Sequence, residues 1–297
     1  FRAIWSWLLI GLGFKIQAQE MKKIQIDENR SIIHIENFKS SYVESRNVDI
    51  YIPSDYNDSV SYKVIYMQDG QNLFNPSYAY NQEALHLDEF LIRNKISNLI
   101  VVGVWNTEAR YREYLPNEMY NALSRKDKKS IRKEYKGKPI GDLYLKFLLE
   151  ELMPFIEKNF SLSRRREDTF IGGISMGALI SFYAALKYPE IFGTSICLST
   201  HWPISVAHNK ASIPTAYYSC IKNYCPRISN SRFYFDYGTD NIDSWYEEYQ
   251  TQIDEILVPY IKHPIENYQS LKFEFASHAM FDWKKRIQVP INFLLKN

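Results

Sequence analysis

Residues 169–180 read TFIGGISMGALI, a short apolar run followed by a glycine-rich turn and a second apolar run. Within them, Gly173-Ile-Ser-Met-Gly177 matches the pattern G-x-S-x-G, which marks a sharp strand-to-helix turn that lifts a serine hydroxyl above a sheet. Glycine is needed on both sides of the serine, because side chains there would collide with the neighbouring strand and helix. Ser175 is therefore the candidate nucleophile, and a serine that only caps the following helix is the alternative.

On either side of this turn, short apolar runs alternate with helical patterns, which is typical of a mainly parallel sheet covered on both faces. Two segments near the start alternate apolar and polar residues with period two and predict an antiparallel pair. The predicted strands are Ser31–Asn37, Arg46–Ile52, Val64–Met67, Leu99–Val104, Thr169–Ile171, Thr194–Leu198, Phe233–Phe235 and Leu271–Phe275. The predicted helices are Gln82–Arg93, Asp142–Lys158, Met176–Lys187, Ser244–Ile261 and Asp282–Leu295.

These patterns predict an α/β fold with a mainly parallel central sheet, helices on both faces and antiparallel strands on the N-terminal side. No repeat or low-complexity linker interrupts the series, so residues 19–297 are expected to form a single domain.

With 297 residues, 45% of them hydrophobic, the chain is not a disordered or collagen-like protein. Its formal net charge of +2 gives no field that favours nucleic acid as a partner. It also carries no Walker-type loop, dinucleotide fingerprint or metal-spaced His/Cys set, so we expect neither cofactor nor metal.

The first eighteen residues read FRAIWSWLLIGLGFKIQA and resemble a secretory signal. Arg2 precedes the apolar run Ile4–Phe14, whose eleven residues are too few to span a bilayer as a helix. We therefore expect cleavage after Ala18, a secreted or periplasmic protein, and no stable membrane span once the signal is removed. A buried N-terminal helix is the alternative for this segment.

A serine hydroxyl needs a base to take its proton and a carboxylate to orient that base. In folds with this turn the chain order is serine, acid, histidine. His278 follows the last predicted strand and precedes the last predicted helix, which places it at the same sheet edge as Ser175. The acid is expected in the loop GTDNID, where sequence spacing does not separate Asp240 from Asp243 and the other residue is expected to cap the next helix. Asp236, inside the preceding strand, is the weakest candidate.

Backbone N–H groups are expected to bind the negative charge that develops on the substrate oxygen. Met176 supplies one of them, at the start of a helix whose dipole favours an anion. Asp69-Gly70-Gln71-Asn72 directly follows the predicted strand Val64–Met67, and Gly70 permits a close approach of the backbone. Gly70 and Gln71 are therefore candidates for the second amide, and an ordinary turn is the alternative.

Several blocks together resemble the "putative esterase" family of α/β-hydrolases, the esterase D-like group, from about Asn47 to the C-terminus. The blocks are YMQDGQNLFN, VVGVWN, GDLYLKFLLEELMPFIE, IGGISMGALIS, FDYGTDNIDSWYEEYQ and the end segment with His278, Trp283 and Arg286. The resemblance implies a triad of Ser175, His278 and an acid, with Asp243 favoured over Asp240. It also implies an oxyanion hole formed by the amides of Met176 and of the Gly70–Gln71 turn. This chain departs from the family at Ala276-Ser277, where glycine is common, and at Ser199-Thr-His-Trp202, where Ser-Pro is common.

The family includes acetyl and feruloyl esterases of plant polysaccharides, siderophore esterases, thioester hydrolases and mycolyl transferases. We expect this chain to hydrolyse carboxylic esters through an acyl-enzyme, with acetyl or feruloyl esters of carbohydrate, small or polymeric, as substrates. Acyl transfer to a sugar or alcohol, siderophore or thioester hydrolysis, and carbohydrate binding without catalysis are the alternatives. Position makes six residues candidates for the substrate pocket, although aromatic residues there can equally belong to the core. They are Trp105, Arg110, Tyr111, Tyr114, His201 and Trp202.

Two further features stand outside this scheme. Cys220 and Cys225 lie in a predicted loop, where they could form a small disulfide in an oxidising compartment, whereas Cys197 lies in an apolar run and is expected to be buried. Ser124–Lys138 carries eight basic and two acidic residues. A solvated helix is the simpler interpretation of that segment, and a surface for an anionic polymer or a phosphate-bearing substrate is the more specific one.

Overall fold

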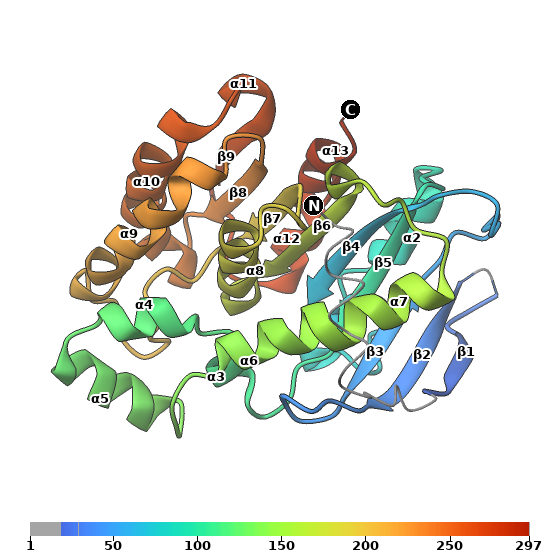
Figure 1. Ribbon diagram of the computed structural model, residues 1–297, viewed down its shortest axis with the longest axis horizontal. Helices are drawn as coiled ribbons and strands as arrows, with labels where there is room; N and C mark the ends of the chain where they lie inside the picture. The colour runs from blue at the N-terminus through green and yellow to red at the C-terminus, as the bar shows by residue number, and fades with distance from the viewer. Residues whose placement is uncertain (1–18, 29, 297) are drawn as a thin grey trace, which may run out of the picture.

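The computed structural model describes residues 19–28 and 30–296, so the predicted signal segment lies outside the described residues. The described residues form one nine-stranded sheet of order β1-β2-β3-β5-β4-β6-β7-β8-β9 (Figure 1). β1, β2, β3 and β5 pair antiparallel in that order, and all pairs from β5 to β9 are parallel. The strands are β1 Met21–Gln25, β2 Ser31–Phe38, β3 Arg46–Tyr51, β4 Lys63–Gln68, β5 Leu99–Val104, β6 Thr169–Ile174, β7 Thr194–Leu198, β8 Arg232–Gly238 and β9 Tyr268–Phe273. The predicted α/β class and the N-terminal antiparallel strands are confirmed.

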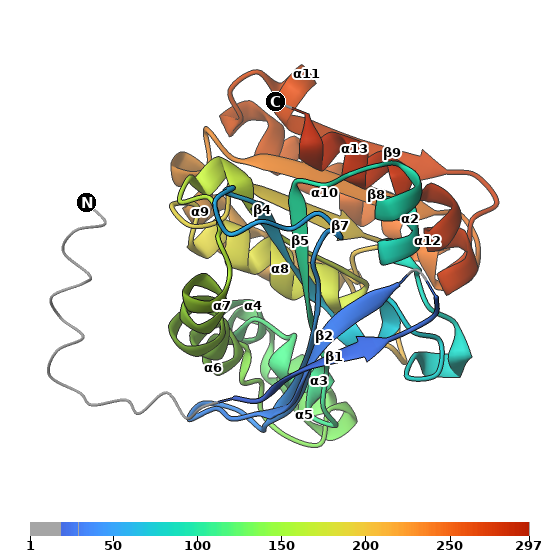
Figure 2. The same cartoon turned by 90° about the vertical axis from the view of Figure 1, so that its right-hand side faces the viewer.

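Helices cover both faces of the sheet. Figure 2 shows α6, α7 and α8 on one side and α2, α12 and α13 on the other. The α-helices are α2 Leu87–Arg93, α3 Arg110–Glu113, α4 Asn117–Ala122, α5 Arg125–Glu134, α6 Gly141–Lys146, α7 Met153–Asn159, α8 Met176–Lys187, α9 Ser212–Tyr224, α10 Tyr246–Leu257, α11 Pro264–Asn267, α12 Met280–Arg286 and α13 Gln288–Leu295. A π-helical segment, Phe147–Leu152, joins α6 to α7. Shorter 3₁₀ turns are η2 Gly70–Asn72, η3 Tyr80–Gln82, η5 Arg166–Asp168, η6 Cys225–Arg227, η7 Asn241–Trp245 and η8 Val258–Tyr260.

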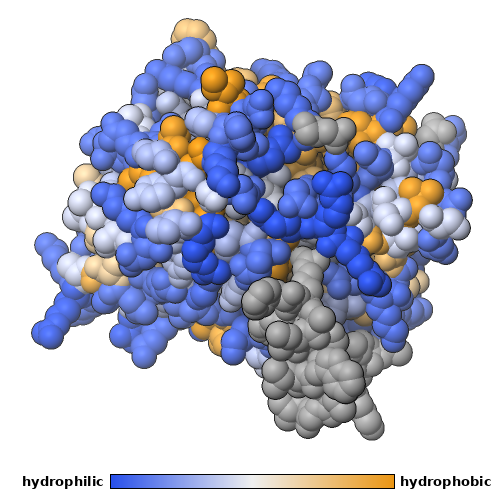
Figure 3. Space-filling model, turned by 45° about the horizontal axis from the view of Figure 1, so that its top comes forward, coloured by the Kyte–Doolittle hydropathy of each residue, from blue (hydrophilic) through white to orange (hydrophobic). Residues whose placement is uncertain are grey.

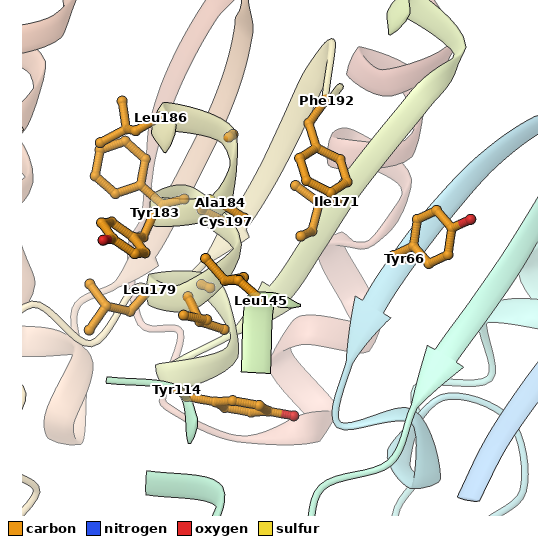
Figure 4. Packing of buried hydrophobic residues seen from close by; sticks show 14 of the residues in the cluster. Tyr66, Tyr114, Leu145, Ile171, Leu179, Tyr183, Ala184, Leu186, Phe192 and Cys197 are labelled. Carbon is orange, nitrogen blue, oxygen red and sulfur yellow. The ribbon is translucent and has the colours of Figure 1, made fainter. Parts of the chain in front are cut away.

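The central strands separate two hydrophobic cores, because successive side chains of a strand point to opposite faces. On β4, Val64 and Tyr66 belong to the core under α6–α10, whereas Ile65 and Met67 belong to the core under α2 and α13. Figure 4 shows Tyr66 and Ile171 from neighbouring strands in the same core as Leu145 of α6 and Leu179 of α8. The continuous apolar runs seen in the sequence therefore reflect strands that are buried on both faces.

Several predicted boundaries were wrong. β1, α3, α4, α9 and α11 were not predicted. The helix predicted from Gln82 begins at Leu87, because the chain first makes a 3₁₀ turn in which Asn81 has a positive φ of 54°. The helix predicted over Asp282–Leu295 is divided at Ile287 into α12 and α13. Proline at position 290 has no backbone N–H to continue a helical ladder, so it suits the first turn of α13.

The cysteines do not form the disulfide that the sequence left open. Cys220 lies within α9 and Cys225 just after it, and both are free thiols. Residues five apart on a helix point about 140° away from each other, so this pair cannot close a small loop. Cys197 is buried on β7 as predicted, and burial raises the pKa of its thiol to about 12.

The surface is predominantly polar. Figure 3 shows hydrophilic residues over most of the face in view, with apolar residues scattered among them. Within residues 19–28 and 30–296, no helix is both long enough and apolar enough to cross a membrane.

Candidate active site

The turn after β6 carries Ser175 on a backbone that few residues adopt. Ser175 has φ 60° and ψ −122° and immediately precedes α8. Non-glycine residues held in such sparsely populated conformations are concentrated at functional sites. A Cβ atom on Gly173 would lie only 2.6 Å from the carbonyl carbon of Gly177, so the strand and the helix approach closely enough to require glycine. Ser175 therefore stands at the carboxyl end of a central strand, half-buried.

His278 is within hydrogen-bonding distance of this serine. It lies in the loop between β9 and α12, and its Nε2 is 3.0 Å from Ser175 Oγ. Its Nδ1 is 2.6 Å from Asp243 Oδ1. A histidine whose Nδ1–H donates to a carboxylate keeps Nε2 free to accept a proton. The three side chains, from loops after β6, β8 and β9, thus form one continuous hydrogen-bonded line.

Asp243, in η7, is fully buried, and its second oxygen is also occupied. Asp243 Oδ2 accepts hydrogen bonds from Ser199 Oγ at 2.6 Å and from the Gly238 amide at 2.8 Å. Burial acts to raise the pKa of Asp243, but the hydrogen bonds from His278, Ser199 and Gly238 outweigh burial and hold the pKa below its usual value. The carboxylate is therefore ionised at neutral pH and fixes the orientation of His278.

Asp240 occupies a different position. Its side chain is exposed, and its nearest described side-chain contact is the Thr239 hydroxyl at 3.4 Å. It stands at the N-cap position of η7 but makes no side-chain capping bond, contrary to the expectation that it caps that helix. The structure brings Asp243, and not Asp240, to His278.

A buried polar cluster lies behind Asp243, and the sequence patterns predicted no role for its members Ser199, Trp283 and Arg286. Ser199 Oγ accepts hydrogen bonds from Trp283 Nε1 at 2.9 Å and from Arg286 Nη2 at 2.8 Å while donating to Asp243. Arg286 Nη2 also pairs with Asp236 Oδ1 at 2.9 Å. The Trp283 ring meets the His278 ring edge-on at 4.9 Å. The spacing of Trp283 and Arg286 after His278 was the signal in the sequence that could have identified this cluster.

Arg286→Met should lower the free energy of unfolding by about 3–5 kcal/mol, because Asp236 would remain as a buried, uncompensated charge. Adding Asp236→Asn should recover part of the loss. The adjacent Lys285→Met is the control, with an expected change below about 1 kcal/mol, because the Lys285 ion pair with Asp282 is on the surface. Urea denaturation at pH 7 measures all of these changes. An Arg286→Met protein as stable as the parent would show that this cluster does not stabilise the fold.

The loop after β4 packs against the start of α8. A Cβ on Gly177 would lie 2.9 Å from Gln68 Cβ and 3.2 Å from Asp69 Oδ2, and a Cβ on Gly70 would lie 2.3 Å from the backbone of Gly103. Gly70 therefore allows η2 to lie directly on β5. As the first residue of α8, Met176 has an amide without an acceptor inside the helix. The turn after β4 and the start of α8 are thus packed against each other at the carboxyl edge of the sheet.

The loop after β4 is held in place by an ion pair and by hydrogen bonds. Asp69 has a left-handed backbone with φ 58°, and Arg110 binds both of its carboxylate oxygens at 2.7 and 2.8 Å. Asn106 Nδ2 donates to Asp69 Oδ1 at 2.6 Å, and the backbone N–H of Asn106 donates to Gln71 Oε1 at 3.2 Å. Arg110, predicted to bind substrate, is therefore engaged in holding the Gly70–Gln71 turn.

Three more of the predicted pocket residues lie in the interior. Tyr114 is fully buried, and its hydroxyl accepts a hydrogen bond from the Asp69 amide at 3.2 Å. Trp202 is fully buried and donates to Gln250 Oε1 at 3.0 Å. His201 accepts from Tyr246 Oη at 2.6 Å and donates to the Ser205 carbonyl at 3.1 Å. Burial, together with the nearby His278, lowers the pKa of His201 to about 3, so it is a neutral structural residue.

Trp105 and Tyr111 remain accessible. Trp105 is half-buried, its Nε1 donates to Asp49 Oδ2 at 2.7 Å, and its ring lies 5.5 Å from that of the exposed Tyr78. Tyr111 is exposed and packs on Tyr135 with ring centroids 5.1 Å apart. Trp105 directly follows the carboxyl end of β5, and Tyr111 lies on α3. Among residues 19–28 and 30–296, no group of three or more His, Cys, Asp or Glu side chains is placed to hold a metal ion.

Residues 40–242 of the chain match the protein family described as "Putative esterase". The chain belongs to this family. It is 32% identical to the uncharacterized protein YbbA of Bacillus subtilis over 150 residues, about half of each protein (50% of this chain and 54% of YbbA). It is 25% identical over 210 residues to an endo-1,4-beta-xylanase/feruloyl esterase of Xylanibacter ruminicola, covering 68% of this chain and 26% of that protein.

A solved structure has the same fold. The enterochelin esterase of Shigella flexneri superimposes with a TM-score of 0.64 over 94% of this chain and 60% of that one, at 18% sequence identity. The chain thus belongs to the "Putative esterase" family and shares its fold with a solved esterase.

Proposed function

We propose that this chain is a serine carboxylic-ester hydrolase in which Ser175, His278 and Asp243 are the catalytic residues. The observation that carries the proposal is the unbroken hydrogen-bonded line from Ser175 Oγ through both nitrogens of His278 to a buried, ionised carboxylate. Nucleophile, base and orienting acid in this geometry define the Ser-His-Asp arrangement on any fold.

The chemistry follows from the positions of the atoms. His278 Nε2 accepts the Ser175 proton as Oγ attacks the ester carbonyl carbon, and Asp243 stabilises the imidazolium that forms. The amides of Met176 and of the Gly70–Gln71 turn are the donors for the resulting oxyanion. His278 then returns the proton to the departing alcohol, which leaves an acyl group on Ser175. Water, deprotonated by the same nitrogen, hydrolyses that acyl-enzyme and restores the serine.

Acetyl or feruloyl esters of carbohydrate are the proposed substrates. The relative from Xylanibacter ruminicola combines a xylanase with a feruloyl esterase, which supports an ester attached to a polysaccharide. The accessible rings of Trp105 and Tyr111 at the sheet edge offer apolar faces of the kind that pack against sugar or aromatic groups. This substrate class agrees with the export predicted from residues 1–18, because polysaccharides too large to cross a membrane are met outside the cell. Parallel assays with acetylated, feruloylated and siderophore-like esters distinguish these substrates.

A fluorophosphonate probe should label the folded protein covalently at Ser175, because the activated hydroxyl attacks phosphorus as it would attack an ester carbonyl. Peptide mass spectrometry identifies the modified residue. Urea-unfolded protein is the control and should remain unlabelled, since unfolding separates Ser175 from His278. Labelling at another residue, or equal labelling of the unfolded chain, would contradict the proposed nucleophile.

A further inference from the structure

Helix α5 carries one uninterrupted basic face. It is ten residues long, and its exposed cations follow the helical period on a single side. At 3.6 residues per turn they fall within an arc of about 120°, opposite the side on which Asp127, Ile131 and Tyr135 are buried. We call these five residues the α5 basic face: Arg125, Lys126, Lys129, Arg132 and Lys133.

No acidic residue of the segment offsets this charge on the exposed side. Asp127 is buried and accepts a hydrogen bond from Ser124 Oγ at 2.6 Å. Glu134 accepts hydrogen bonds from Ser205 Oγ at 2.8 Å and from the Val206 amide at 2.7 Å. Across residues 19–28 and 30–296, the ion pairs within 4.0 Å include none to the five cations of the α5 basic face. Their charges are therefore available to a partner.

The charge is concentrated here rather than spread over the molecule. With eight basic and two acidic residues, Ser124–Lys138 has a net charge of +6. Because the whole chain carries only +2, the remaining residues carry −4. A localised positive surface on an otherwise acidic protein directs an anionic partner to one place.

That place adjoins the candidate active site. Tyr135, directly after α5, donates a hydrogen bond to the Ile204 carbonyl, and its hydroxyl is 3.8 Å from Sδ of Met176, the residue after Ser175. Glu134 binds the loop that follows His201. In Figure 1, α5 lies beyond the end of the sheet toward which the arrows of β4 and β6 point. The α5 basic face lies on the side of the helix opposite Tyr135, so a polymer bound to it must cross the width of α5, about 10–12 Å, to bring an ester to Ser175.

We propose that the α5 basic face binds an anionic polysaccharide, a polymer with one carboxylate on each sugar, while an ester carried by the same polymer enters the site at Ser175. Lysine and arginine on long flexible stems can meet such regularly spaced carboxylates without a fixed pocket. An α5 of ten residues is about 15 Å long, which extends the contact over several sugars. The substrate class is thus narrowed from carbohydrate esters in general to esters of polyuronates.

Other anionic partners fit this face less well. A helix that binds membranes inserts an apolar side into the lipid, but the apolar side of α5, with Ile131 and Tyr135, is buried in the protein. Single-stranded nucleic acid is bound by aromatic side chains that stack on the bases, and the α5 basic face contains none. Both partners are outcomes of the test below.

Binding is measured on the Ser175→Ala protein, with unesterified polygalacturonate as the probe, by isothermal titration calorimetry at 50 and 200 mM salt. We expect the affinity for polygalacturonate to fall as salt rises. In Lys126→Gln/Lys129→Gln/Lys133→Gln the affinity should fall by at least about tenfold. Lys95→Gln/Lys158→Gln/Lys262→Gln is the matched control. The control removes three positive charges, as the α5 variant does, but from exposed lysines that precede β5, β6 and β9, at the amino ends of the strands. Its affinity should equal that of the parent.

The kinetic counterpart uses the enzyme with Ser175 intact. The ratio of kcat/KM for acetylated polygalacturonate to kcat/KM for p-nitrophenyl acetate should fall about tenfold in the α5 variant and stay constant in the control. This ratio cancels any general loss of active protein.

Polygalacturonate binding that is absent, or equal in the two triple variants, overturns the proposal. So does tighter binding to phosphatidylglycerol vesicles or to single-stranded DNA than to polygalacturonate. The substrate assignment rests on the proposed function, whereas binding by the Ser175→Ala protein does not. Lysine-dependent binding by an enzyme that hydrolyses no ester would therefore support the binding surface and reject ester hydrolysis.

Discussion

Ser175→Ala is expected to lower kcat/KM for p-nitrophenyl acetate by about 10⁵–10⁶-fold. Without the hydroxyl no acyl-enzyme can form. The substitution removes Ser175 Oγ, which lies 3.0 Å from His278 Nε2 and supplies the proton that this nitrogen accepts. The oxyanion donors and the binding surface stay in place, so a residual rate above that of water alone should remain. Initial rates at pH 7.5, measured at enzyme concentrations high enough to detect the residual rate, quantify the loss.

Ser181→Ala is the matched control for this substitution. Ser181 lies on the same helix, α8, is fully buried, and its hydroxyl has no hydrogen-bond partner among the described residues. Removing that hydroxyl should leave kcat/KM within about twofold, and stability should not fall, since an unsatisfied polar group is lost. A Ser175→Ala protein that keeps more than a tenth of the parental activity would exclude Ser175 as the nucleophile.

The sheet could be predicted because burial leaves a direct trace in the sequence. β4, β5 and β6 are covered on both faces, so their residues form apolar runs with no polar alternation. The turn at Ser175 was equally readable, because Gly173 and Gly177 are set by contacts inside one strand–helix unit. Elements that depend on tertiary contacts were missed. α9, for example, has a mixed composition that resembles a loop until Tyr217 and Ile221 are seen to be buried in the core.

The candidate site shows the same division. The sequence order of strands places Ser175 and His278 at one edge, and the structure brings their side chains together. The choice between Asp240 and Asp243 depends on which side chain points inward from a 3₁₀ turn, which spacing alone does not reveal. Tyr114 and Trp202 lie near the site in the chain but turn into the core, because an aromatic ring that is fully packed removes more apolar surface from water than an exposed one.

Asp243→Asn is expected to lower kcat by about 10⁴-fold while changing KM little. The amide oxygen can still accept the hydrogen bonds from Ser199 and Gly238, so the fold around η7 should persist. Its NH₂ group then faces His278 Nδ1 and donates to it, which leaves the proton on Nε2. Because Nε2 then carries a proton, it can no longer accept the proton of Ser175. The side chains keep their positions, but His278 no longer acts as the base.

Asp240→Asn removes the same charge from the same loop and is the matched control, with expected kcat within about twofold, because its side chain is exposed and does not contact His278. The pH profile adds a second measurement. The pKa of Asp243 lies below its usual value, so the carboxylate stays ionised between pH 7 and pH 5, and protonation of Asp243 should not limit parental activity in that range. Equal losses in the two variants would mean that removal of charge from the loop, rather than the orientation of the imidazole, limits the reaction. A larger loss in Asp240→Asn would make Asp240 the catalytic acid and would require the loop to rearrange when substrate binds.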